Sequence, residues 1–169
     1  MKKLEISDRS QAETKAPNYQ YACFETCGLM VAGYYLDKKL DADAYRKACL
    51  ANGAINDKFS ILDHEKLMTA AGISDRVVKI DKQPTVDKIK SCIDNDNPVI
   101  ISLNGEHYEL INGYDEFGFY IDDPGFQGDT NTDNSLEVFH LDASGDKVFS
   151  KGHNGSHRKI TTILWFEKQ

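Results

Sequence analysis

The order of helical and extended segments is the feature that most limits what this chain can fold into. Apolar residues recur at helical spacing behind a capping residue in four segments, and we expect helices over residues 26–36, 41–52, 63–71 and 85–93. Short apolar or β-branched runs predict strands over residues 76–80, 98–103, 107–114, 117–122, 136–141, 147–149 and 159–166. Helices first and antiparallel strands second predict an α+β fold, with N-terminal helices packed on a C-terminal antiparallel β-sheet.

Two of these predictions place residues relative to one another. The run 98–103 is almost continuously apolar, which is typical of a strand buried on both faces. Only Asp115 and Glu116 separate the strands 107–114 and 117–122, so these strands should form a hairpin. A hairpin brings the end of its second strand back beside the start of its first.

Composition and charge indicate a globular protein and exclude several function classes. Hydrophobic residues make up 40% of the 169 residues, which is ordinary for a chain long enough to bury a core. The net charge of −7 argues against nucleic-acid binding, because the one basic cluster is the short segment 153–159. No apolar run reaches about 18 residues, and polar residues follow Lys3 where a signal peptide would be apolar. We therefore expect no membrane partner and a cytoplasmic location, with export by a signal-independent secretion system left open.

The domain organisation is expected to be simple. Residues 1–18 are polar, lack periodicity and contain Pro17, so we expect a mobile N-terminal arm. Residues 19–169 are expected to form a single domain. The sequence does not specify an oligomeric state.

A cysteine at the predicted start of the first helix is the strongest candidate for chemistry. Thr26 can cap the first turn, which places Cys27 at the helix N-terminus. Partial positive charge there favours the thiolate, the form that attacks carbonyl carbons. The alternative is a small apolar residue buried at a helix start, because free cysteine is often buried.

A thiolate nucleophile needs a base, and the base needs an orienting group. His107 lies at the start of the first hairpin strand, and Asp123 follows the second strand. The hairpin therefore makes these two residues plausible neighbours. Asp122 is the alternative carboxylate, although strand alternation lets only one of the adjacent pair face the histidine easily.

The order of these residues resembles the papain-like cysteine peptidases. A glutamine precedes a Cys-Gly pair that opens a helix, and a buried Pro-Val-Ile strand follows. Gly-x-His then leads a hairpin through Gly-Tyr-Asp to an Asp-Pro turn. The chain is most similar to the compact branch that includes the double-glycine leader peptidases of bacteriocin exporters and their stand-alone relatives. The resemblance covers residues 19–125 and implies a papain-like fold.

The resemblance also implies a role for each site residue. Cys27 would be the nucleophile, His107 the general base and Asp123 the residue that orients the imidazole. Gln20 matches the glutamine whose side chain, with the backbone N–H of Cys27, would form the oxyanion hole. This chain departs from the pattern there, because Gln20 lies one residue further from Cys27 than expected and Cys23 intrudes between them.

These residues together predict a cysteine hydrolase that cleaves a peptide or amide bond of a peptide or protein substrate through an acyl-enzyme. Such an enzyme could be a processing peptidase or a toxin-like effector. The same site would act as an acyltransferase if an amine replaced water, and as a deamidase if glutamine were the substrate. The alternative is a catalytically silent papain-like module that binds peptides. The presence of Cys27, His107 and Asp123 favours catalysis, because a binding module has no need of all three.

No metal or cofactor is expected. Cys23, Cys27, Cys49 and Cys92 are expected to be free thiols, and the Cys23-x-x-x-Cys27 pair lacks a second ligand pair for zinc. The segment from Asp129 to Glu137 alternates oxygen ligands as a calcium loop does. Its sixth and twelfth positions are Asn134 and His140, however, where glycine and glutamate are needed, so a solvated acidic loop is the better interpretation. His140, His153 and His157 are better explained by a flexible turn than by a zinc cluster.

Overall fold

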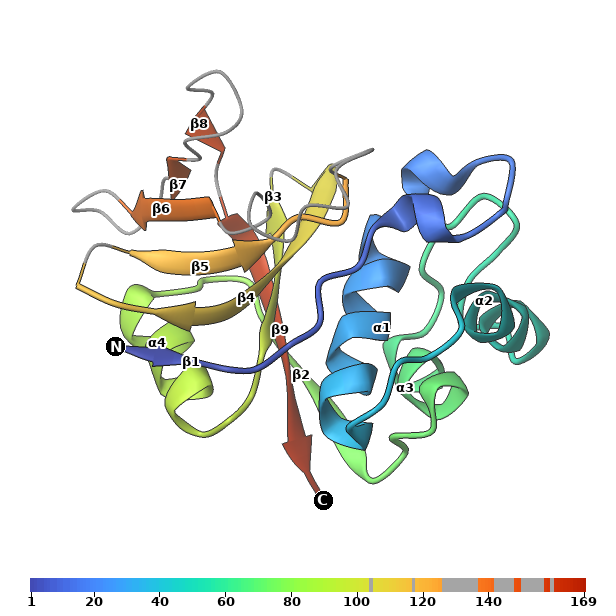
Figure 1. Ribbon diagram of the computed structural model, residues 1–169, viewed down its shortest axis with the longest axis horizontal. Helices are drawn as coiled ribbons and strands as arrows, with labels where there is room; N and C mark the ends of the chain where they lie inside the picture. Colours follow the sequence, from blue (N-terminus) through green and yellow to red (C-terminus); the bar gives the residue numbers. More distant parts are fainter. Residues whose placement is uncertain (104, 117, 126–136, 142–147, 150–156, 159) are drawn as a thin grey trace.

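The computed structural model describes residues 1–103, 105–116, 118–125, 137–141, 148–149, 157–158 and 160–169. Its helices are α1 (Cys23–Leu36), α2 (Ala42–Ala51), α3 (His64–Ala71) and α4 (Val86–Asp94), with 3-10 turns η1 (Gln11–Glu13) and η2 (Tyr19–Tyr21) before α1. Its strands are β1 (Lys2–Lys3), β2 (Arg76–Asp81), β3 (Val99–Leu103), β4 (His107–Tyr114), β5 (Phe119–Asp122), β6 (Glu137–Leu141), β7 (Val148–Phe149), β8 (His157–Arg158) and β9 (Ile160–Lys168). The expected α+β fold, with helices packed on an antiparallel sheet, is confirmed (Figure 1).

The sheet is antiparallel and has the strand order β2-β9-β3-β4-β5-β6-β7-β8, with β1 paired to β4. All residues of β3 are buried, as its continuous apolar run predicts. The hairpin of β4 and β5 is also confirmed, with Leu110 opposite Asp122. The register of this hairpin shifts between Ile111 and Gly113, which marks a bulge at Asn112.

Two apolar cores lie on opposite faces of the sheet. Ile100 belongs to the core shared with α1, α2 and α3, whereas its neighbour Ile101 belongs to the core covered by α4. This alternation follows from the side-chain period of two along a strand. In Figure 1, α1 to α3 accordingly lie on one side of the sheet and α4 on the other.

Three of the helices begin where the sequence predicts because a side chain caps each of them. Asp41 accepts a hydrogen bond from the backbone N–H of Ala44 in α2. Asp63 caps α3, and Thr85 caps α4, in the same way. Such a side chain satisfies an N–H group of the first helical turn that has no acceptor within the helix.

The start of α1 was predicted wrongly. The helix begins at Cys23, with Ala22 as its N-cap and no capping side chain. Thr26 lies inside the first turn, where its hydroxyl and its backbone N–H both donate to the carbonyl oxygen of Ala22. The first turn is held by burial instead, since Cys23 to Ala32 are all buried.

The N-terminal segment lies along the domain. Lys2 and Lys3 pair with Tyr114 and Gly113 of β4, and the N–H of Leu4 donates to Asn112. Ser10 then forms a capping box with Glu13 at η1. Residues 1–14 therefore run from the edge of α4 to the N-terminal end of α1, as the blue trace in Figure 1 shows.

Other expectations have different outcomes. All four cysteines are free thiols, as expected. Within the described residues, no helix combines the length and the apolar character needed to cross a membrane. The calcium-loop hypothesis for Asp129 to Glu137, and the zinc alternative at His140, His153 and His157, concern side chains that lie outside the described part of the chain.

Candidate active site

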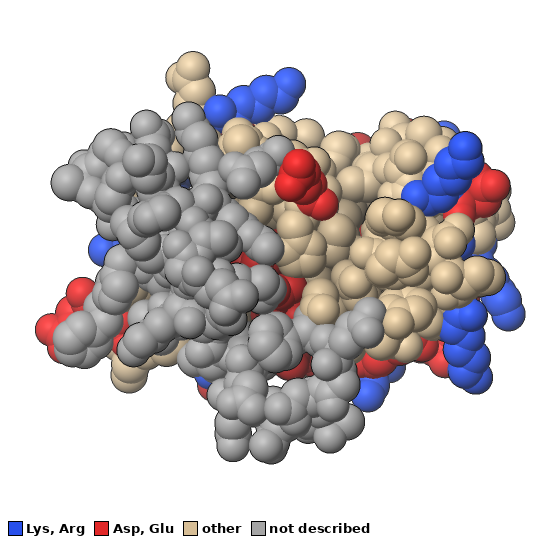
Figure 2. Space-filling model, turned by 90° about the horizontal axis from the view of Figure 1, so that it is seen from above, with Lys and Arg blue, Asp and Glu red and all other residues tan. Residues whose placement is uncertain are grey.

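Three elements bring chemically useful side chains together at the upper end of the molecule in Figure 1. These are the N-terminal end of α1, the start of β4 and the end of β5. Figure 2 shows this end from above: Lys and Arg side chains stand around the margin of the view, and acidic side chains also lie near its centre. The described residues of this face are mostly uncharged between them.

His107 and Asp123 are in direct contact, as the hairpin predicts. The Nε2 atom of His107 lies 2.7 Å from Oδ1 of Asp123. Asp123 is 4% exposed and follows β5 directly, whereas the adjacent Asp122 accepts a hydrogen bond from Asn112 at 2.8 Å. Of the two carboxylates left open by the sequence, Asp123 is therefore the one that contacts the imidazole.

Gly125 holds this pair from the other side. Its backbone N–H donates to Oδ1 of Asp123 at 2.7 Å, so that oxygen accepts from both Gly125 and His107. A Cβ atom on Gly125 would lie 3.0 Å from Cε1 of His107 and 3.1 Å from Oδ1 of Asp123. The backbone can approach the ring this closely because residue 125 has no side chain.

Cys23, and not Cys27, is the cysteine that contacts His107. A side-chain hydrogen bond links the imidazole to Cys23, the first residue of α1. Burial by itself lowers the pKa of His107, but the hydrogen bonds with Asp123 and Cys23 outweigh it and raise that pKa to about 10. The site therefore favours the imidazolium form, flanked by a carboxylate and a sulfur.

Cys27 lies one helical turn further along α1, about 6 Å along the helix axis. It is fully buried, with 0% exposure against 7% for Cys23. Burial raises the pKa of the Cys27 thiol well above its usual value, and the neighbouring Cys23 and Asp123 raise that pKa further. Because α1 begins at Cys23, Cys27 lies inside the helix and not at its N-terminus. Its thiol is buried in the core, and this burial keeps the thiol protonated.

The two glutamines near the helix start are arranged differently from what the sequence suggests. Gln20 is exposed on η2. Gln11 is buried, with 5% exposure, and its Nε2 donates to the carbonyl oxygen of Gln20 at 3.2 Å. The backbone N–H of Gln11 donates to Pro124 at 2.9 Å, directly beside Asp123. Sequence analysis missed Gln11 because it lies in the polar segment expected to be a mobile arm.

Glu109 is a second carboxylate that sequence analysis missed. It is 2% exposed, and its Oε1 lies 3.8 Å from Nε2 of His107. The signal was present in the sequence, because residues 107 and 109 share one face of a strand. His107, Glu109 and Asp123 each offer a ligand atom within 4.8 Å of the others, which is a spacing that could hold a metal ion. Nε2 of His107 already forms a hydrogen bond with Asp123, however, so the arrangement is also explained without a metal ion.

A comparison of the sequence with models of protein families identifies the family of this chain. The model of the Peptidase_C39-like family matches residues 3–144. The chain belongs to the Peptidase_C39-like family. This family and the fold indicate a cysteine peptidase, and the resemblance to the double-glycine leader peptidases is confirmed. No curated protein sequence matches the chain.

Solved structures share the fold of this C39-like chain at low sequence identity. A double-glycine motif protease from an AMS/PCAT transporter, in complex with its leader peptide, has a TM-score of 0.56 and 17% identity, covering 99% of this chain and 95% of its own. The peptidase domain of Streptococcus ComA, a bi-functional ABC transporter involved in quorum sensing, has a TM-score of 0.52 and 14% identity, covering 88% and 93%. A C39-like peptidase from Bacillus anthracis has a TM-score of 0.55 and 12% identity, covering 100% and 98%.

Proposed function

We propose that this C39-like chain is a cysteine peptidase in which Cys23 is the nucleophile, His107 the general acid and base, and Asp123 the carboxylate that orients the imidazole. The observation that carries the proposal is the position of His107, which is hydrogen-bonded to Cys23 and to Asp123. Cys23 takes the role that the sequence suggested for Cys27. The substrate is a peptide, and the structural neighbour solved with a leader peptide supports this choice.

The proposed reaction is acyl transfer in two stages. The Cys23 thiolate attacks the carbonyl carbon of the scissile bond and forms a tetrahedral oxyanion. His107 donates its proton to the leaving amine as the acyl-enzyme forms. It then removes a proton from the water that attacks the acyl carbon, and Cys23 is released.

The oxyanion needs hydrogen-bond donors beside Cys23. The backbone N–H groups that precede Thr26 at the start of α1 have no acceptor within the helix and carry its partial positive charge. We propose Gln11 as the side-chain donor, in place of Gln20, because its buried carboxamide adjoins the segment that leads into α1. One of its two amide hydrogens is engaged by Gln20, which leaves the second to stabilise the oxyanion.

The test is to compare Cys23→Ala with Cys27→Ala. Both variants and the unmodified protein are incubated with a proteome-derived peptide library, and masses are recorded over time. Cys23→Ala should reduce cleavage by about 10³-fold or more, because the nucleophile is lost. Cys27→Ala should keep most of the activity if the small cavity in the core is tolerated.

Brief iodoacetamide treatment followed by mass mapping gives an independent readout. Cys23 should be labelled first, and Cys27, which is fully buried, should be protected. Loss of cleavage in Cys27→Ala with correct folding, together with preferential labelling of Cys27, would refute the assignment. Glutamine deamidation or peptide ligation in place of cleavage would keep the nucleophile but change the reaction class.

A further inference from the structure

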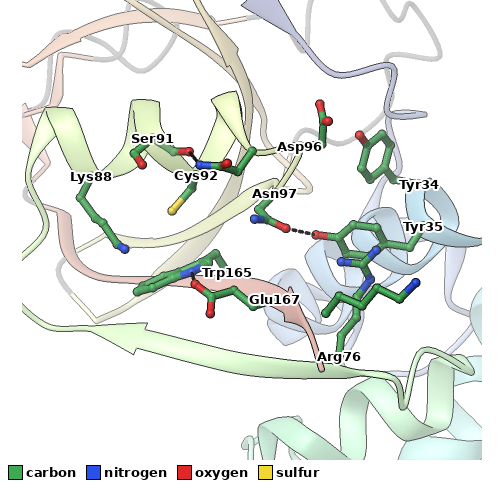
Figure 3. Close-up of a pocket in the computed structure, with 12 residues that line it drawn as sticks. Tyr34, Tyr35, Arg76, Lys88, Ser91, Cys92, Asp96, Asn97, Trp165 and Glu167 are labelled. Carbon is green, nitrogen blue, oxygen red and sulfur yellow. Dashed lines mark hydrogen bonds between the residues drawn. The ribbon is translucent and has the colours of Figure 1, made fainter.

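A cavity lies at the opposite end of α1 from the candidate active site. It occupies about 760 Å³ between the C-terminal end of α1, helix α4 and the paired strands β2 and β9 (Figure 3). That volume is within the range of about 300–1,000 Å³ typical of small-molecule sites. Tyr34 and Tyr35 line the cavity and lie more than ten residues after Cys23 in α1. The rise along the helix axis from Cys23 to these residues is therefore about 17 Å.

Aromatic rings hold two cations in place at this cavity. The guanidinium of Arg76 lies 3.3 Å from the ring centroid of Tyr35, and it donates to the carbonyl oxygen of Phe166 at 3.4 Å. The ammonium of Lys88 lies 4.2 Å from the ring centroid of Trp165. Figure 3 shows Lys88 beside Trp165 on the left of the view and Arg76 against Tyr35 on the right. Cation–π contacts of this kind restrict the Arg76 and Lys88 side chains before a ligand binds, so less conformational entropy is lost on binding.

The acidic side chains of the cavity are already paired with cations outside it. Asp96 lies 2.8 Å from Lys2, and Glu167 accepts from the indole of Trp165 and lies 3.9 Å from Lys79. Neither Lys2 nor Lys79 lines the cavity. Among the described residues, no carboxylate lies within 4.0 Å of Arg76 or Lys88.

The carbonyl groups at the C-terminal end of α4 lie beside the cavity and could attract cations. They already accept hydrogen bonds from neighbouring N–H groups. The N–H groups of Asn95, Asp96 and Asn97 donate to them, and so does the side chain of Asn95. Lys168 adds a third cation to the lining, and Ser91 and Asn97 add neutral polar groups. The lining therefore carries three cations against two carboxylates, and neither carboxylate is paired with Arg76 or Lys88, in a chain whose net charge is −7.

From this charge arrangement we propose that the cavity is a binding site for a small anion that carries two or more carboxylate or phosphate groups. Arg76 and Lys88 are its principal ligands, with Ser91 and Asn97 as neutral hydrogen-bond partners. The planar guanidinium suits a carboxylate or phosphate held by two parallel hydrogen bonds. This site is separate from the proposed cysteine chemistry and does not depend on it.

The test is calorimetric titration of the full chain with pyrophosphate and, separately, with citrate, at constant ionic strength. One saturable site per chain is expected for at least one of them, and the pair distinguishes phosphate from carboxylate recognition. Trp165 is the single tryptophan, so an anion bound to Lys88 beside its ring should also change the intrinsic fluorescence.

Matched variants separate this site from general charge effects. Lys88→Gln and Arg76→Gln should each weaken binding tenfold or more, because a hydrogen bond to a charged group is worth about 1.5–3 kcal/mol. Lys90→Gln is the control, since Lys90 is on the same helix but lies over Tyr114 and not in the cavity. Absence of saturable binding of both anions would overturn the proposal, and so would equal weakening in all three variants.

Discussion

Gln11 and Gln20 differ only in where the fold puts their side chains. The carboxamide of Gln11 is buried beside the start of α1, whereas Gln20 offers its backbone oxygen and leaves its side chain in solvent. A donor stabilises an oxyanion only if it is held in position before the charge develops. The buried residue is held in this way, and the exposed one is not.

Gln11→Ala should therefore lower kcat by about 10²-fold or more, with a small change in KM, because one preorganised donor is worth roughly 3 kcal/mol in the transition state. Gln20→Ala should leave kcat within about a factor of three. Steady-state kinetics on a cleaved peptide measure both, and circular dichroism checks folding. A larger effect for Gln20→Ala would return the oxyanion role to that residue.

The start of α1, which decides which cysteine lies at the helix N-terminus, is what sequence reasoning misplaced. Asp41, Asp63 and Thr85 cap their helices with side chains, and those helices start where the sequence predicts. Helix α1 has no capping side chain, so its start was assigned to Thr26, the nearest residue of a capping type. The sequence therefore suggested Cys27 as the nucleophile, whereas we propose Cys23, the first residue of the helix. His107 and Asp123 were found because a hairpin fixes their proximity through local geometry.

At the scale of elements, the N-terminal segment joins the sheet to the candidate active site. Strand β1 is only Lys2–Lys3, and nothing in its composition distinguishes it from an unpaired arm. Its place depends on Gly113 of β4, where a Cβ atom would lie 2.6 Å from the carbonyl oxygen of Lys2. Local sequence patterns cannot show such a tertiary dependence.

Gly113→Ala should displace β1, because a methyl group at 2.6 Å from a backbone oxygen cannot be accommodated without movement. Overpacking of this kind costs about 1–3 kcal/mol. Hydrogen exchange should then speed up at the amide of Leu4, which donates to Asn112, and at the amide of Gln11, which donates to Pro124. Peptidase activity should fall with it.

Lys2→Ala is the control for that experiment. It removes the ion pair with Asp96 but keeps the backbone pairing of β1 with β4. Exchange at Gln11 should change little in this variant. Unaltered exchange at both amides in Gly113→Ala would show that the segment is held independently of its pairing with β4.

At the scale of the whole molecule, the candidate site lies where the helical part meets the sheet. Cys23 belongs to α1, while His107 and Asp123 belong to the β4–β5 hairpin. Packing between α1 and β4 sets their relative position, and the ring of Phe24 meets the ring of Tyr108 edge-on at 4.8 Å in that interface. The packing between α1 and β4 therefore contributes both to folding stability and to the geometry of the candidate site. The titration of His107 should likewise affect both.

Stability should accordingly fall as pH rises from about 5 to 9. Burial raises the pKa values of Glu25 and Asp122 to about 7, so below pH 7 the folded state binds protons that the unfolded chain releases near its ordinary carboxyl pKa. The pKa of His107 is raised to about 10, so its stabilisation is complete below its ordinary value of 6.5 and is lost as pH rises towards 10. All three groups make the folded state the one that binds more protons. The free energy of unfolding should therefore decrease throughout this interval, by on the order of 2 kcal/mol between pH 7 and 9 from His107.

Urea denaturation at pH 5, 7 and 9, at constant ionic strength, measures this dependence. His107→Gln should remove the larger part of the decrease between pH 7 and 9, because the folded state then lacks the imidazole that keeps a proton released by the unfolded chain. Burial also raises the pKa values of the Cys27, Cys49 and Cys92 thiols, so a smaller decrease near pH 9 should remain. Asp122→Asn should reduce the decrease between pH 5 and 7 and leave the alkaline part intact. A free energy of unfolding that is constant or rising from pH 7 to 9 in the unmodified protein would mean that His107 is neutral in the folded state. Its hydrogen bonds with Asp123 and Cys23 would then not hold the proton that the proposed mechanism delivers to the leaving amine.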